Sequence, residues 1–136
     1  LSHGCFFGPV LAQISKVEDL EREVFGPILH LVVYGPGEIE TVARGLASLR
    51  YGLTLGIHSR IEAFAAQIRR LVPAGNVYVN RAMTGAVVGV QPFGGEGLSG
   101  TGPKAGGPHA LLRYAVERAV SINTTAQGGD PDLLNL

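Results

Sequence analysis

The chain has 136 residues, of which 46% are hydrophobic and 16% charged, as in one well-buried globular domain. Eleven basic residues balance eleven acidic residues, and no run of either sign occurs, so we expect no nucleic-acid partner and no membrane partner. The single cysteine excludes an internal disulfide, and no apolar run approaches the roughly 20 residues that span a bilayer. The first residues do not resemble a signal peptide, and together these features predict a soluble, cytoplasmic protein.

The first third of the chain combines apolar segments with one acidic segment. An apolar opening segment, residues 6–14, precedes residues 17–24, whose spaced apolar side chains among acids predict a short surface helix. Residues 28–34 form a nearly unbroken β-prone run. Such a run favours a strand that is covered on both faces, as in parallel sheets.

Two helices and two more strands are predicted next. Apolar positions repeat at helical spacing over residues 38–49, with Gly52 as the expected stop. Residues 53–57 predict a second strand, residues 61–71 a second helix that ends before a proline, and residues 76–80 a third strand. Strands and helices that alternate through short connections predict an α/β fold with an open parallel sheet.

The remaining third is dominated by glycine and proline. Residues 85–107 hold nine glycines, which predicts a shaped loop rather than regular structure. A short helix is expected at residues 110–114 and a final strand at residues 118–123. The tail that follows mixes glycine, proline and aspartate with a small apolar patch.

The glycine-rich loop contains a literal G-x-G-x-x-G at Gly95, Gly97 and Gly100. A dinucleotide fingerprint needs a strand directly before the first glycine, a helix that opens at the third, and an acidic residue about 20 positions later. Four residues, QPFG, separate the motif from any preceding extended segment, and the glycines and prolines after Gly100 exclude a helix. We therefore expect that this loop does not bind a dinucleotide pyrophosphate.

Composition alone leaves two explanations of these glycines open. They can let backbone N–H groups converge on a small anion such as a carboxylate. Alternatively, they let the loop fit tightly between two subunits or domains.

Two separated motifs resemble the C-terminal part of the aldehyde dehydrogenase superfamily. They are EVFGP at residues 23–27 and QPFGG at residues 91–95, the latter followed by Ser99 and Gly100. Residues 75–108 resemble 1-pyrroline-5-carboxylate dehydrogenase in particular, the enzyme that oxidises L-glutamate γ-semialdehyde to L-glutamate in proline breakdown. The segment ERAVSINTTAQGG is similar to the end of that domain in bacterial bifunctional proline utilization A proteins. The resemblance covers the chain from about residue 6 onward.

The resemblance implies NAD as the cofactor and assigns two residues to it. Glu23 would accept hydrogen bonds from the nicotinamide-ribose hydroxyls, because an ionised carboxylate can accept from two neighbouring hydroxyls. Phe25 would pack beside the nicotinamide as a flat apolar wall. Without the motif, Glu23 is interpreted as a solvated charge and Phe25 as a core residue.

The same resemblance assigns substrate contacts to four residues. Thr84, Gly85 and Ala86 match the loop that anchors the carboxylate of the semialdehyde through backbone N–H groups and a hydroxyl. Phe93 matches an aromatic residue that lines the aldehyde channel, although a role in the core competes with this interpretation.

No catalytic residue is expected within the chain itself. The family needs a cysteine thiolate that attacks the aldehyde and a glutamate base, and both are expected upstream of residue 1. Cys5 lies in the segment that leads into the Glu23 motif, and its neighbours Phe6 and Phe7 predict an apolar site and an inert thiol. The four histidines lack metal-ligand spacing, so no metal is expected.

The sequence therefore predicts residues 1–115 as part of a catalytic domain and residues 116–136 as an oligomerisation strand and tail. Its expected partners are glutamate semialdehyde, the rest of the same polypeptide and further copies in a homo-oligomer. As an isolated segment it should be inactive. The alternative is a non-catalytic module of the same family that serves oligomerisation or covers an active site.

Overall fold

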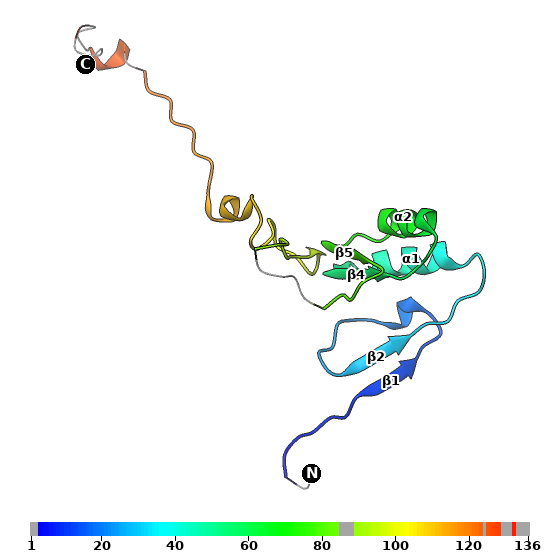
Figure 1. The fold of residues 1–136 in the computed structure, drawn as a ribbon. Helices are drawn as coiled ribbons and strands as arrows, with labels where there is room; N and C mark the ends of the chain where they lie inside the picture. The colour runs from blue at the N-terminus through cyan, green and yellow to red at the C-terminus, as the bar shows by residue number, and fades with distance from the viewer. Residues whose placement is uncertain (1–2, 85–88, 124, 129–131, 133–136) are drawn as a thin grey trace.

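The computed structural model describes residues 3–84, 89–123, 125–128 and 132. Figure 1 shows a body of short strands and two helices, with an N-terminal segment and a long C-terminal arm extending from it. No helix within these ranges has the length and apolarity needed to cross a membrane.

Two pairs of parallel strands form the framework. β1 (Val10–Gln13) pairs with β2 (Ile28–Leu31), and β4 (Thr54–Ile57) pairs with β5 (Asn76–Val79). The helix α2 (Glu62–Leu71) connects β4 to β5, as expected for a crossover between parallel strands. The predicted α/β class with parallel strands is confirmed.

The pairs do not join into one open sheet within the described residues. β2 and β4 belong to separate two-stranded sheets, so each pair keeps unpaired edges. A third pair is antiparallel and joins β3 (Tyr51–Gly52) to β6 (Glu96–Gly97) in the glycine-rich loop. The sequence pattern did not predict β3 or β6, because strands of two residues have no periodicity to detect.

The helix α1 (Ile39–Ser48) begins after a glycine and proline turn and ends earlier than predicted. The Glu38 carboxylate accepts a hydrogen bond from the Gly35 N–H at 2.6 Å and so fixes the turn. At the other end Arg50 has a left-handed φ of 62°, whereas Gly52 lies in β3. The prediction that Gly52 stops the helix is wrong. A glycine is needed there because a Cβ at position 52 would meet the Pro73 carbonyl at 2.6 Å.

A small hydrophobic core lies between the two helices and the β4–β5 pair (Figure 1). Its buried members come from α1, β4 and α2 and from the residue that follows α2: Ala43, Ile57, Ala65, Ile68 and Val72. Half-buried side chains on α1, β4, α2 and β5 pack around this cluster. The helix and strand predictions for residues 53–80 are confirmed because this core enforces both periodicities.

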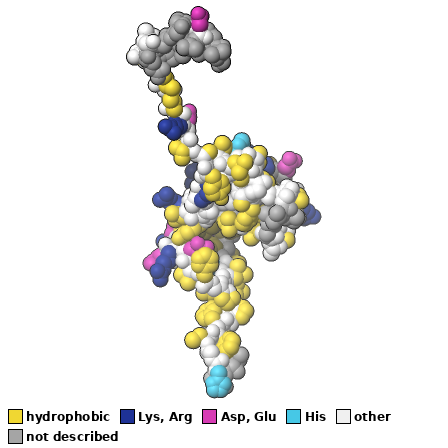
Figure 2. Space-filling view, turned by 90° about the vertical axis from the view of Figure 1, so that its left-hand side faces the viewer, with side chains coloured by type: hydrophobic (Ala, Val, Ile, Leu, Met, Phe, Trp, Pro, Cys, Tyr) yellow, Lys and Arg dark blue, Asp and Glu magenta, His cyan; other side chains and the backbone are white. Residues whose placement is uncertain are grey.

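The β1–β2 pair has little cover from the rest of the chain. Leu29 is 66% exposed and Val33 is 69% exposed, although the sequence predicted a strand buried on both faces. Figure 2 shows hydrophobic side chains along the lower half of the molecule, where this pair and the N-terminal segment lie. The expected burial is wrong for this chain because none of its described elements packs over that surface.

Cys5 also lies in exposed surroundings. Cys5 is exposed, and the neighbouring residues Phe6 and Phe7 are 67% and 62% exposed. The described residues therefore do not enclose the predicted apolar site, and the inert thiol stays a prediction.

Two other predicted elements differ from the structure, and one agrees with it. Only the first turn of the expected helix at residues 17–24 forms, as the 3-10 helix η1 (Val17–Asp19), because Val17 alone is buried there. The short helix η2 (Ala110–Tyr114) is confirmed. Residues 118–123 form no strand: they lie in the arm, away from the described strands, and a strand needs a hydrogen-bonded neighbour. The turn η3 (Thr125–Gln127) follows.

Replacement of Ile68 by alanine should destabilise the fold. Ile68 is 6% exposed, and the lost methyl and methylene groups leave a cavity that costs about 2 to 4 kcal/mol. Thermal or urea unfolding of the polypeptide that carries this segment measures the change. Arg69→Ala is the matched control, since Arg69 is the exposed neighbour on α2 and should change stability by about 0.5 kcal/mol or less. Equal losses from both variants would contradict the described core.

Candidate functional site

The glycine-rich loop is bonded to the strands beside it. Its Leu98 N–H donates to the Arg50 carbonyl at 2.8 Å, and the Ser99 hydroxyl accepts from the Gly52 N–H at 3.1 Å. The β3–β6 pairing joins the same two segments. These bonds hold the loop along the end of α1 and β3.

Close backbone packing explains the glycines of this loop. A Cβ on Gly95 would overlap the Ser99 carbonyl, and a Cβ on Gly100 would overlap the Gly95 carbonyl. The N–H groups of Ser99 and Gly100 donate to carbonyls within the loop, at 3.0 and 3.4 Å. The described structure therefore explains these glycines by the packing of the loop on itself and on strands of its own chain, while the anion site and the fit between subunits or domains stay predictions.

Phe93 lies at the start of this loop in a short antiparallel bridge. Its N–H donates to the Ala105 carbonyl and its carbonyl accepts from the Ala105 N–H, both at 3.0 Å. Phe93 is half-buried. An open apolar groove of about 610 Å³ adjoins this bridge, lined in part by Pro92, Lys104 and Leu112.

Glu23 and Phe25 lie in the connection between η1 and β2, and both are exposed. The Phe25 side chain is 91% exposed, and the Glu23 carboxylate makes no hydrogen bond or ion pair with any described residue. The Glu23 N–H donates to the Tyr51 hydroxyl at 3.3 Å. Because Tyr51 pairs with Gly97, this tyrosine connects the Glu23 segment to the glycine-rich loop. Sequence analysis missed Tyr51, and only a three-dimensional contact identifies it.

Thr84 is exposed and follows the end of β5, whereas Gly85 and Ala86 lie outside the described residues. The chain enters this segment through Asn80, which has a left-handed φ of 55°. The Asn80 side chain accepts from the Ser59 N–H and donates to the Ser59 carbonyl, both at 2.9 Å. Asn80 thereby fixes the direction in which the chain leaves β5 toward Thr84.

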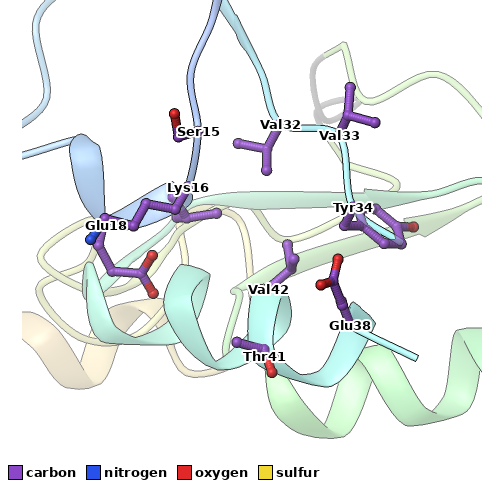
Figure 3. Close-up of a pocket in the computed structure, with 10 residues that line it drawn as sticks. Ser15, Lys16, Glu18, Val32, Val33, Tyr34, Glu38, Thr41 and Val42 are labelled. Atoms are coloured by element: carbon purple, nitrogen blue, oxygen red, sulfur yellow. The ribbon is translucent and has the colours of Figure 1, made fainter. Parts of the chain in front are cut away.

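A separate pocket of about 220 Å³ lies between η1, the segment after β2, and α1 (Figure 3). Lys16 and Glu18 line one side, and Tyr34 and Glu38 line the other. None of the four predicted site residues that the structure describes, Glu23, Phe25, Thr84 and Phe93, lines this pocket. Among the described residues, no three His, Cys, Asp or Glu side chains form a group that could hold a metal ion.

The chain matches the aldehyde dehydrogenase family over residues 1–120. It therefore belongs to that family. Among its relatives, the bifunctional protein PutA of Klebsiella aerogenes is 48% identical over 134 residues, which cover 96% of this chain and 10% of that protein. The mitochondrial delta-1-pyrroline-5-carboxylate dehydrogenase of Mus musculus is 38% identical over 124 residues, 88% of this chain and 22% of that protein.

The solved structures give the same result. A Bradyrhizobium japonicum proline utilization A superposes with a TM-score of 0.78 and 58% sequence identity, over 92% of this chain and 13% of that chain. The sequence therefore spans about a tenth of its bifunctional relatives and about a fifth of the mitochondrial one.

Replacement of Gly100 by alanine should distort the glycine-rich loop. The added methyl overlaps a backbone carbonyl that cannot rotate away, so we expect a loss of about 1 to 3 kcal/mol. The melting temperature of the polypeptide that carries the segment measures it. Gly8→Ala is the control, because a Cβ there meets no atom within 4 Å. An unchanged melting temperature for Gly100→Ala would contradict the packing described above.

Proposed function

We propose that the chain is the C-terminal segment of an NAD-dependent dehydrogenase that oxidises L-glutamate γ-semialdehyde to L-glutamate in proline catabolism. Family membership and the names of its relatives support this proposal. The observation that carries it in the structure is the pair of exposed, motif-matched residues Glu23 and Phe25, positioned through Tyr51 beside the loop that holds Phe93.

These two residues fit the nicotinamide half of NAD. The Glu23 carboxylate has all its acceptor positions free among the described residues, and the Phe25 ring is exposed enough to cover an apolar surface. The cofactor, when bound, supplies the hydride acceptor of the reaction. Glu23 orients the ribose by accepting from its two hydroxyls, and Phe25 limits water on one side of the ring.

Glu23→Ala should raise the KM for NAD about tenfold, because hydrogen bonds to a charged acceptor contribute about 1.5 to 3 kcal/mol. The KM for the aldehyde should change little. Steady-state kinetics of the intact enzyme measure both constants. Glu21→Ala removes another exposed carboxylate two residues earlier and should leave the KM for NAD unchanged. If both variants raise the KM for NAD equally, the assignment of Glu23 fails.

Thr84, Gly85 and Ala86 are proposed to hold the carboxylate of the semialdehyde. Asn80 fixes the direction in which the chain leaves β5 toward Thr84. Thr84 is exposed, so its hydroxyl is available to a ligand. A hydroxyl and backbone N–H groups all donate, which suits a carboxylate that only accepts. Phe93 is proposed to line the aldehyde channel.

Thr84→Ala combined with Gly85→Val should raise the KM for glutamate semialdehyde about tenfold or more, since the change removes one donor and crowds the backbone. The KM for propanal should change much less, because propanal has no carboxylate to anchor. Kinetics of the intact enzyme with both aldehydes provide the comparison. Equal effects on the two substrates would remove the anchor assignment.

The nucleophilic cysteine and the general base are proposed to belong to the rest of the polypeptide, so the segment alone should not oxidise aldehydes. The exposed apolar surface of β1 and β2 is consistent with further polypeptide packing there. The division into residues 1–115 and 116–136, the homo-oligomer and the cytoplasmic location stay predictions. So does the alternative of a non-catalytic module, which a full-length sequence without a nucleophilic cysteine would favour.

A further inference from the structure

The side chain of Asn76, the first residue of β5, bonds to the backbone on both sides of Phe93. Its Nδ2 group donates to the Pro92 carbonyl at 3.1 Å, and its Oδ1 atom accepts from the Gly94 N–H at 3.2 Å. Asn76 is only 9% exposed, so its amide is largely shielded from water, and both bonds are partly buried. One buried amide therefore satisfies two backbone groups that flank a single aromatic residue.

The other edge of Phe93 is occupied as well. In an extended segment, the N–H and carbonyl of one residue point to one edge, and the flanking carbonyl and N–H point to the opposite edge. Ala105 binds the first pair of groups through two 3.0 Å bonds, and Asn76 binds the second pair. The Asn76 amide thus replaces a neighbouring strand, and the backbone of Phe93 is bonded along both edges.

Lys104, which precedes Ala105, bonds the Ala105 side of the bridge to the start of β5. Its ammonium group donates to the Gly75 carbonyl, directly before Asn76. A Cβ on Gly94 would lie 3.2 to 3.5 Å from Lys104, so the lysine stem packs closely against the glycine. Both sides of the Phe93–Ala105 bridge are therefore fixed to the start of β5.

We propose that Asn76 is a positioning residue that fixes the Phe93 ring in the aldehyde channel. This inference rests on the proposed function, in which Phe93 lines that channel. Without the amide, the Pro92 carbonyl and the Gly94 N–H lose their partner in a partly buried site. The segment then shifts to find other partners, and the ring moves with it.

The test uses Asn76→Leu, Phe93→Leu and the double variant in the intact enzyme. Leucine has the same branched arrangement of four side-chain heavy atoms as asparagine but forms no hydrogen bond. The change therefore removes the two Asn76 bonds around Phe93, here called the clamp, and leaves no large cavity. Asn76→Leu should lower kcat/KM for glutamate semialdehyde about tenfold and leave the KM for NAD unchanged. In the Phe93→Leu background the same change should have little further effect, because Asn76 acts through Phe93. Additive losses would overturn the proposal.

Two controls separate positioning from general destabilisation. Val77→Ala alters the next residue of β5, whose side chain packs on the core instead of the loop, and it should lower the melting temperature without lowering kcat/KM. If it lowers kcat/KM as much as Asn76→Leu does, the proposal is overturned. Asn76→Asp serves if the leucine variant does not fold, because it keeps the acceptor for Gly94 and removes the donor to Pro92; it should show the same coupling to Phe93.

Hydrogen exchange distinguishes failure of the clamp from failure of the proposed function. Asn76→Leu should speed exchange of the Gly94 amide, which the clamp protects, while amides within α2 stay unchanged. Unchanged exchange at Gly94 would overturn the clamp itself. If exchange rises but Phe93→Leu leaves the aldehyde kinetics unaltered, the channel role of Phe93 fails, and the positioning proposal fails with it.

Discussion

The close backbone approach between the glycine-rich loop and β3 is the constraint on which the candidate site depends. Gly97 lets the loop approach the Arg50 carbonyl beside β3, which accepts from the Leu98 N–H, and Gly95 and Gly100 let the loop pack on itself. The loop therefore supports Phe93 through hydrogen-bonded and closely packed backbone, and we expect it to bind no pyrophosphate. The G-x-G-x-x-G pattern arises because a side chain at any of its three glycines would overlap a backbone carbonyl.

The same support connects the two halves of the proposed site. Tyr51 pairs with the loop through its backbone and accepts from the Glu23 N–H through its hydroxyl. The segment with the proposed cofactor residues and the loop with the proposed channel residue thus both contact β3. This arrangement suits a reaction in which a nicotinamide and an aldehyde must meet at a fixed separation.

The sequence predicted the fold best where local pattern and burial agree. The elements from residue 53 to residue 80 follow their apolar periodicity because Ile57, Ala65 and Ile68 meet in one core. Prediction failed where the outcome depends on contacts outside a local window. The strand at residues 118–123 lacks a neighbour to pair with, and β3 and β6 are too short for any pattern.

In the candidate site, too, some residues were predicted from the sequence and others were found only from contacts in the fold. The motifs predicted Glu23, Phe25 and Phe93 by resemblance, but Tyr51 and Asn76 carry no signal in the sequence. Their roles arise from bonds across 28 and 16 to 18 positions of chain. A hydroxyl or amide that supports a functional residue cannot be predicted before the fold brings the two together.

Arg50, which follows α1 and has a left-handed backbone, connects the end of the helix to the glycine-rich loop. A non-glycine residue in this conformation costs about 1 kcal/mol or more, and here its carbonyl accepts the Leu98 N–H. If the loop detaches, that bond is lost and the end of α1 is free to relax. We therefore expect the end of α1, β3 and the loop to open and close together when the native protein fluctuates.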